Sequence, residues 1–183
     1  MRYGNIKYCD IADGEGVRTT LFVSGCTHHC KGCFQPETWD FSFGEEFTPA
    51  TAELIYESVA PAYIDGVTVL GGEPLEPANQ GPVADFLEEF KRRFPGKTVW
   101  LYTGDTYESI VDPASPRRTR ATDRLLSFVD VLVDGPFVEE LKDISARFRG
   151  SSNQRIIDMK ATRAAGGVVE WSDDDAFAKR GEW

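Results

Sequence analysis

The sequence predicts a single α/β domain with a mainly parallel sheet, shaped as an incomplete, open (βα) barrel. Short β-rich segments alternate with helical patterns along the chain, and this alternation is typical of βαβ units. Each expected strand also ends in a polar or glycine-rich motif. A complete barrel needs about 250 residues, whereas this chain has 183. We therefore expect the sheet to remain open.

Four segments are expected to be buried strands because they are rich in β-branched, aromatic and leucine side chains. They are Thr19–Val23, Val67–Leu70, Thr98–Tyr102 and Val129–Val133. Helical patterns lie between these segments, so consecutive strands are expected to run parallel.

Two strong helical patterns and two weaker ones fill the intervals. Pro49–Ala60 follows Thr48, a good N-cap residue, and places proline at the first helical position. Pro82–Phe94 carries an apolar stripe at helical spacing, and Pro95-Gly96 ends it. The weaker patterns cover Thr106–Val111 and Thr122–Phe128.

The composition is that of a globular protein, with 41% hydrophobic and 27% charged residues. The net charge of -10 argues against a broad nucleic-acid interface and against binding to anionic membranes. The first residues lack the apolar core of a signal peptide, and no apolar run has the length of a membrane span. We expect a cytoplasmic protein, in which clustered cysteines more often bind metal or take part in chemistry than form disulfides.

Three of the four cysteines lie in one short loop with the spacing C-x3-C-x2-C: Cys26, Cys30 and Cys33. A closed structural zinc site has four protein ligands, and a disulfide framework uses even numbers. Three thiolates can hold a [4Fe-4S] cluster and leave one iron open to a small molecule. A zinc site stays open as an alternative, with His28, His29 or Cys9 as its fourth ligand.

The expected strands all run into distinctive motifs. The motifs are the cysteine loop, Gly71-Gly72-Glu73-Pro74, Thr103-Gly104-Asp105 and Asp134-Gly135-Pro136. Because the carboxyl ends of parallel strands line the ligand site of α/β proteins, these motifs are expected to converge.

The cysteine spacing followed by an aromatic residue, Phe34, resembles the signature of radical S-adenosylmethionine enzymes, and Gly71-Gly72-Glu73 resembles a second segment of that family. The resemblance implies a (βα) barrel of the radical S-adenosylmethionine type. It also implies a [4Fe-4S] cluster whose open iron binds the methionine part of S-adenosylmethionine. In this family, reductive cleavage of the cofactor starts hydrogen abstraction.

Further segments resemble one branch of that superfamily. Asp13–Thr19 is similar to the DGPGxR segment of glycyl-radical enzyme activases, with Glu15 in place of the proline. In combination with VLVDGPFV and RGSSNQR, residues 1–157 resemble the activating proteins of the anaerobic ribonucleoside-triphosphate reductase. The implied partners are the catalytic subunit of that reductase, from which a glycine hydrogen is abstracted, and an electron donor such as flavodoxin or ferredoxin.

The resemblance assigns roles residue by residue. The cluster ligands, and with them the catalytic residues, are Cys26, Cys30 and Cys33. The cofactor contacts are Gly32, Cys33 and Phe34 on the adenosine side, Gly71, Gly72 and Glu73 at the methionine end, and Thr103 and Asp134 at strand ends. For Asp134 a turn-forming Asp-Gly pair is an equal alternative.

The remaining features leave alternatives open. Residues 1–160 are expected to form the core domain, and 161–183 an extension with an edge strand and a mobile acidic tail. Arg117, Arg118 and Arg120 form a basic loop that we interpret as solvated, although it could dock a partner. A cofactor or partner contact is expected for Arg149, Ser152, Asn153 and Arg155, and a polar turn without a functional role is the alternative. The alternative functions are an activase of another glycyl-radical enzyme, an enzyme that makes a small molecule, and a zinc-stabilised binding module.

Overall fold

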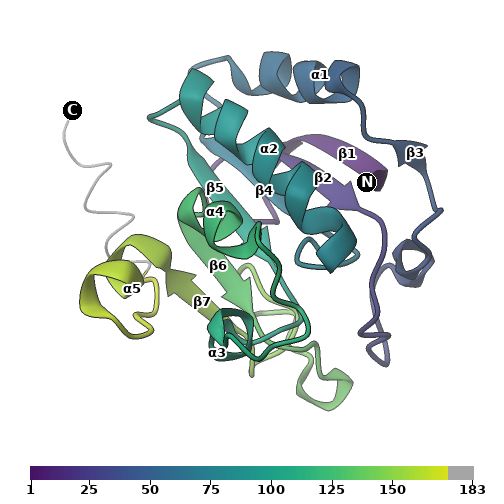
Figure 1. The fold of residues 1–183 in the computed structure, drawn as a ribbon, viewed down its shortest axis with the longest axis vertical. Helices are drawn as coiled ribbons and strands as arrows, with labels where there is room; N and C mark the ends of the chain where they lie inside the picture. The colour runs from purple at the N-terminus through teal and green to yellow at the C-terminus, as the bar shows by residue number, and fades with distance from the viewer. Residues whose placement is uncertain (173–183) are drawn as a thin grey trace.

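The computed structural model describes residues 1–172 and contains a seven-stranded sheet with the order β3-β1-β2-β4-β5-β6-β7 (Figure 1). The strands are β1 Arg2–Asp10, β2 Arg18–Val23, β3 Glu45–Glu46, β4 Gly66–Gly71, β5 Thr98–Tyr102, β6 Val131–Asp134 and β7 Arg155–Asp158. The strands β2, β4, β5 and β6 are parallel, as predicted. The outer strands β1, β3 and β7 pair antiparallel, so the sheet is mixed and open. The α/β class and the open sheet are thereby confirmed, while the barrel type implied by the resemblance stays a prediction.

Three helices cover one face of this sheet, in front of it in Figure 1: α1, α2 and α4. The helices are α1 Pro49–Val59, α2 Pro77–Arg93, α3 Tyr107–Val111, α4 Thr122–Ser127 and α5 Met159–Ala165, with short 3-10 turns at Pro36–Trp39 and Glu139–Leu141. Among residues 1–172, none of the helices combines the length and the apolarity that crossing a bilayer requires.

The predicted start of α1 agrees with the structure, whereas the predicted start of α2 does not. Thr48 caps α1 as predicted, accepting a hydrogen bond from the Thr51 amide. Helix α2 begins five residues before the predicted start, at Pro77, and accommodates Pro82 inside it. The extra turn contains two buried polar residues, Asn79 and Gln80, and the Asn79 amide donates to the carbonyl oxygens of Ser24 and Glu73. This turn is held by tertiary hydrogen bonds and not by an apolar stripe. The helical spacing of apolar residues therefore did not predict it.

Alternation along the parallel strands separates two environments. Toward the helices point Leu21, Val23, Val67, Val69, Val99 and Leu101, all of them buried in the main core. The intervening residues face the side without helices and include Arg18, Thr20, Thr68 and Trp100, all nearly inaccessible to solvent. On that side a small aromatic cluster forms, in which Trp100 contacts Phe148 and Trp171.

The sequence pattern did not reveal the outer strands. Strand β1 is only partly buried and contains a bulge near Cys9, whose φ is 52°. Residues 168–171 pair with the outer edge of β7, with the Trp171 amide donating to the Ile156 carbonyl at 2.9 Å. Helix α5 runs across the domain boundary expected after residue 160, and the expected acidic tail lies outside the described residues.

Candidate functional site

A cavity of about 560 Å³ lies at the carboxyl ends of the central strands, on the side of the sheet without helices. Three strand-end motifs supply its wall. The lining residues from these motifs are Cys26, Cys30 and Cys33 with Phe34, then Gly71, Gly72 and Glu73, and then Thr103 and Gly104. The predicted convergence is therefore found for the motifs after β2, β4 and β5. Gly32 and Asp134 are not among the lining residues.

The cysteine loop is held by main-chain contacts to the 3-10 turn at Pro36–Trp39. The amides of Gly25 and Cys26 donate to the carbonyl oxygens of Thr38 and Trp39 at 2.8 and 3.2 Å. His29 and Gly32 take left-handed conformations, with φ of 49° and 72°. The Cys33 amide donates to the Cys30 carbonyl oxygen at 3.1 Å and closes a turn around Gly32, and all three cysteines of the loop line the cavity.

The three cavity thiols are free and differ in burial: Cys26 is buried, while Cys30 and Cys33 are partly exposed. Burial raises the pKa of Cys26 to about 11 and also raises the pKa of Cys30. Because iron is bound by thiolates, loading this site releases protons. A set of thiols beside an open, partly apolar cavity fits an iron–sulfur cluster with a small-molecule ligand.

The zinc alternative fits this geometry less well. A single zinc ion would draw its thiolates to within about 4 Å of one another. Within residues 1–172, the group of possible ligand atoms found within 4.8 Å of one another is His28, Glu73 and Asp105, not the three cysteines. Of the possible fourth ligands, Cys9 and His29 do not line the cavity, and the His29 ring packs on Trp39 at 4.7 Å.

Glu73 is 1% exposed and its carboxylate joins three segments. Oε1 accepts from the Leu75 amide at 2.8 Å, and Oε2 accepts from the Gly104 amide at 2.8 Å. Oε2 also accepts from the Thr103 hydroxyl at 3.1 Å and lies 3.1 Å from His28 Nε2. The carboxylate therefore fixes the ends of β4 and β5 against the cysteine loop.

The two glycines before Glu73 are required by close packing of the backbone. A Cβ at Gly71 would lie 2.7 Å from the Val23 carbonyl oxygen, and one at Gly72 would lie 2.7 Å from the Gly25 carbonyl oxygen. Gly71 also has a φ of 105°. Any side chain here would push the end of β4 away from the cysteine loop, so the Gly-Gly pair sets the width of the cavity wall.

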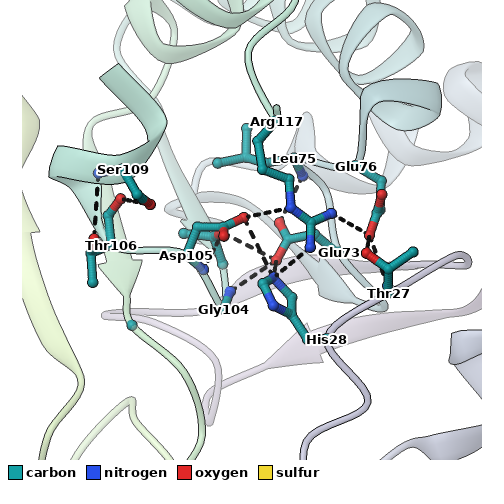
Figure 2. Close-up of polar contacts among 12 residues, drawn as sticks. Thr27, His28, Glu73, Leu75, Glu76, Gly104, Asp105, Thr106, Ser109 and Arg117 are labelled. Carbon is teal, nitrogen blue, oxygen red and sulfur yellow. Dashed lines mark hydrogen bonds and ion pairs between the residues drawn. The ribbon is translucent and has the colours of Figure 1, made fainter. Parts of the chain in front are cut away.

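An ionic network surrounds Glu73 on the helix side of the cavity (Figure 2). Glu76 accepts hydrogen bonds from the Thr27 amide and hydroxyl at 2.8 and 2.6 Å and pairs with Arg117. Asp105 and then Glu73 raise the pKa of His28 to about 9. Sequence reasoning missed Arg117: its side chain is 18% exposed rather than solvated, and nothing in the run of arginines distinguishes it from its neighbours.

A second polar group at the cavity lies at the end of β1 and in the segment that follows it. Asp13 lines the cavity, and burial followed by a hydrogen bond with Asp10 raises its pKa to about 7. Burial alone would raise the pKa of Asp10, but hydrogen bonds from Asp13 and Lys7 outweigh it and hold the pKa well below its usual range. The Tyr102 hydroxyl, which is also buried here, has no hydrogen-bond partner among residues 1–172. The sequence analysis did not predict that Asp10, Asp13 and Tyr102 lie near one another.

The remaining predicted residues divide between the cavity and its support. Phe34 lies 5.3 Å from Phe137, ring to ring, and Arg149 lines the cavity. Asp134 is fully buried behind the wall, where it accepts from the Tyr107 amide at 2.7 Å and from Arg155 Nε at 3.0 Å. Ser152 and Asn153 are exposed and are not among the lining residues.

An α/β domain with three free thiols in one strand-end cavity is the framework of a single-cluster iron–sulfur protein, and residues 12–157 match the family described as "4Fe-4S single cluster domain". The chain is 36% identical over 156 residues to the anaerobic ribonucleoside-triphosphate reductase-activating protein of Enterobacteria phage T4, covering 85% of this chain and 93% of that one. The protein of the same name from Haemophilus influenzae is 39% identical over 158 residues, covering 85% and 97%. That from Escherichia coli K12 is 36% identical over 156 residues, covering 84% and 96%. The chain belongs to the family of anaerobic ribonucleoside-triphosphate reductase-activating proteins.

Proposed function

We propose that this protein activates the anaerobic ribonucleoside-triphosphate reductase by generating a glycyl radical on its catalytic subunit. The observation that carries the proposal is the shared cavity: three free thiols and the Gly-Gly-Glu segment open into the same space in a member of this family. An activase of another glycyl-radical enzyme would have the same cavity, and the partner used in the assay separates the two.

In this proposal Cys26, Cys30 and Cys33 hold a [4Fe-4S] cluster with one iron open to S-adenosylmethionine. When bound and reduced, the cluster supplies the electron that cleaves S-adenosylmethionine to methionine and a 5′-deoxyadenosyl radical, which takes the glycine hydrogen atom. Because burial raises the pKa of the Cys26 and Cys30 thiols, these two must release protons to become ligands.

The other residues of the cavity bind, orient and shield. We place the methionine end at Gly71, Gly72 and Glu73, with Thr103 beside them. The adenosine side lies toward Gly32, Cys33 and Phe34. Asp134 acts from behind the wall, because its carboxylate is already engaged by Tyr107 and Arg155. It therefore supports the ends of β6 and β7 rather than touching the cofactor.

The open side of the sheet allows a protein substrate to reach the cavity. Apolar side chains line much of it and limit the access of water: Phe22, Trp39, Leu70, Phe137 and Phe148. A glycine-bearing segment of the reductase would enter from the side that lacks helices. A flavodoxin or ferredoxin in the cytoplasm would supply the electron in this scheme.

The test is an anaerobic assay of the reconstituted protein. After reduction and addition of S-adenosylmethionine, 5′-deoxyadenosine is quantified with and without the reductase catalytic subunit, and the glycyl radical is measured by electron paramagnetic resonance. Product and radical from the wild type but not from Cys30→Ala are expected. Bound zinc without acid-labile sulfide would return the three cysteines to a structural role, and product without a reductase radical would indicate another partner.

A further inference from the structure

Three acidic side chains lie close together at one corner of the site, where Glu73 lines the cavity and Glu76 and Asp105 adjoin it, and their charges must be balanced. Glu73 and Glu76 are 1% and 4% exposed, and the Asp105 side chain is 15% exposed. Carboxylates at this depth are costly unless they are paired or hydrogen-bonded. Amide and hydroxyl donors bind Glu73 and Glu76. Within residues 1–172, the buried Asp105 Oδ2 makes no hydrogen bond of good geometry, and its cationic neighbours are Arg117 Nε at 3.3 Å and His28 Nε2 at 3.4 Å.

We infer that Arg117 is a positioning residue, the built-in counter-cation that holds these carboxylates, and with them three strand ends, around the cofactor cavity. This inference rests on the proposed function for its consequence in S-adenosylmethionine binding. Figure 2 shows the guanidinium between Glu76 on one side and Asp105 on the other. Its Nη1 pairs with Glu76, its Nε lies 3.3 Å from Asp105 Oδ2, and its Nη2 lies 3.4 Å from His28 Nε2.

The loop that carries Arg117 is itself fixed to the wall. Gln80 of α2 donates from Nε2 to the Arg117 carbonyl oxygen at 2.7 Å. The side chain thus enters the corner from an anchored backbone, with 18% of its surface exposed. Burial by itself would lower the pKa of Arg117, but Glu76, Asp105 and Glu73 raise it, so the guanidinium stays charged. Arg118 turns outward and pairs with the exposed Asp123.

The contacts of the guanidinium extend to the cysteine loop and to both neighbouring strand ends. Glu76 binds the Thr27 amide and hydroxyl, which places it directly against the cysteine loop. Asp105 follows Gly104, whose amide binds Glu73. Without the guanidinium, Glu76 would lose its cationic partner and Asp105 would keep only His28, at 3.4 Å, so the repulsion between the two carboxylates would be balanced less completely. The loop after β2 and the turn after β5 would then separate, and the cavity between them would widen.

A metal ion could in principle fill the same role. His28, Glu73 and Asp105 place ligand atoms within 4.8 Å of one another. The guanidinium already lies against two of these three side chains, at 3.3 Å from Asp105 and 3.4 Å from His28. Its planar fork reaches separate carboxylates at the same time, which the point charge of lysine matches poorly. Assembly of this corner is therefore expected to need no added metal ion.

The experiment compares Arg117→Ala and Arg117→Lys with the matched control Arg118→Ala, all as reconstituted holoproteins. Iron and sulfide contents should equal those of the wild type. The dissociation constant for S-adenosylmethionine should rise about 10- to 100-fold in Arg117→Ala, with partial recovery in Arg117→Lys. Millimolar guanidinium chloride, but not sodium chloride, should restore binding in Arg117→Ala and have no effect on the control.

A second measurement needs no cofactor. Amide hydrogen exchange of the apoprotein should be about tenfold faster at Thr27 and Gly104 in Arg117→Ala and unchanged in Arg118→Ala. Wild-type exchange at both amides in Arg117→Ala would overturn the inference whatever the cofactor does. If Arg117→Ala fails to fold, Arg117→Lys decides: wild-type exchange and cofactor affinity in that variant would reject the need for the fork. Failure of the wild type to bind S-adenosylmethionine would instead reject the proposed function and leave the exchange result to decide the role of Arg117.

Discussion

The two faces of the sheet have different compositions and serve different purposes. The face under α1, α2 and α4 is packed with aliphatic and aromatic side chains and carries the main core. The other face carries a buried arginine, threonines, a carboxyl pair and the thiol-lined cavity. Because successive strand residues point to opposite faces, one strand can contribute to both. Alternate residues of the same strands therefore form the stabilising core on one face and the candidate site on the other, and no separate domain is needed for either.

Strand β4 shows the separation most clearly. Val67 and Val69 are fully buried under the helices. Thr68 lies on the opposite face, where it accepts from Arg18 Nε at 2.7 Å and donates to the Asp13 carbonyl at 2.7 Å. The strand then delivers Gly71 to the cavity. A shift of β4 by one residue would place Thr68 in the core and a valine against Arg18. The alternation of polar and apolar residues therefore fixes the orientation of both faces.

The largest expected effect is the loss of the cluster and of activity at the open face, while the hydrophobic core stays folded. Cys30→Ala removes one of the three cavity thiols and should abolish cluster retention, 5′-deoxyadenosine formation and the glycyl radical. Iron, sulfide and product are measured after identical anaerobic reconstitution. Cys9→Ala is the matched control, because Cys9 is exposed on β1 away from the cavity. Equal iron content in Cys30→Ala and Cys9→Ala would remove Cys30 from the ligand set.

The second effect concerns the helix-covered face alone. Leu87 of α2 is fully buried in the main core, and Leu87→Ala should lower the free energy of unfolding by about 2–5 kcal/mol through lost burial and the cavity left behind. Urea denaturation of the apoprotein measures it. Below the unfolding transition, the variant should still load iron and sulfide to the wild-type ratio. A loss of cluster in the folded variant would show that the two faces are coupled.

The third effect is smaller and depends on pH. The pKa of Asp13 is raised to about 7, whereas an aspartate in the unfolded chain titrates near 3.9, so between these values the folded state holds a proton that the unfolded state has lost. The stabilisation from this proton is complete below about pH 4 and disappears as pH rises to about 7. Asp13→Asn copies the protonated acid, so its stability relative to the wild type should improve with rising pH by about 1 kcal/mol.

Urea titrations of both proteins at several pH values across this range measure the difference. Asp10, Lys7 and Tyr102 are the neighbouring groups that can titrate or carry charge, and they are unchanged in the variant. Lys7→Gln serves as a control for the general loss of a charge next to the pair. A pH-independent difference between Asp13→Asn and the wild type would show that the pKa of Asp13 in the folded protein is not raised above its unfolded value.

The difference between the faces also explains how far the fold could be predicted. The strands β2, β4, β5 and β6 were identified because apolar runs mark strands buried on both faces. Strand β1 mixes charged and aromatic residues and is only partly buried, so its pattern is weak. It is an antiparallel neighbour of β2, a pairing that depends on tertiary contacts and not on a local signal. The start of α2 was not predicted for the same reason: Asn79 and Gln80 are polar residues that are buried by tertiary contacts.

The cavity was predicted where residue type and spacing carry the chemistry, as in the three cysteines and the Gly-Gly-Glu segment. It was not predicted where the role depends on distant partners. Arg117 is separated from Glu76 by many residues in sequence, and only the fold brings the two together. Asp134 follows a strand just as Thr103 does, but Arg155 and Tyr107 hold it behind the wall. Strand-end position alone does not tell which way a side chain turns.

The smallest expected effect concerns two buried tyrosine hydroxyls. The hydroxyl on the helix-covered face makes a hydrogen bond, and the one on the open face is expected to make none. In the part of the chain that the structure describes, the Tyr102 hydroxyl is buried without a hydrogen-bond partner, and burial raises the pKa of Tyr102 well above its usual value. A buried hydroxyl in this condition costs free energy, so Tyr102→Phe should leave the apoprotein equally stable or more stable by up to about 1 kcal/mol. Tyr56→Phe on the helix-covered face is the matched contrast, because the Tyr56 hydroxyl donates to the Phe86 carbonyl at 2.9 Å and its loss should cost about 1 kcal/mol. The two phenylalanine variants, compared by urea denaturation of the apoprotein, should therefore change stability in opposite directions. Equal destabilisation would mean that the Tyr102 hydroxyl has a partner in solution.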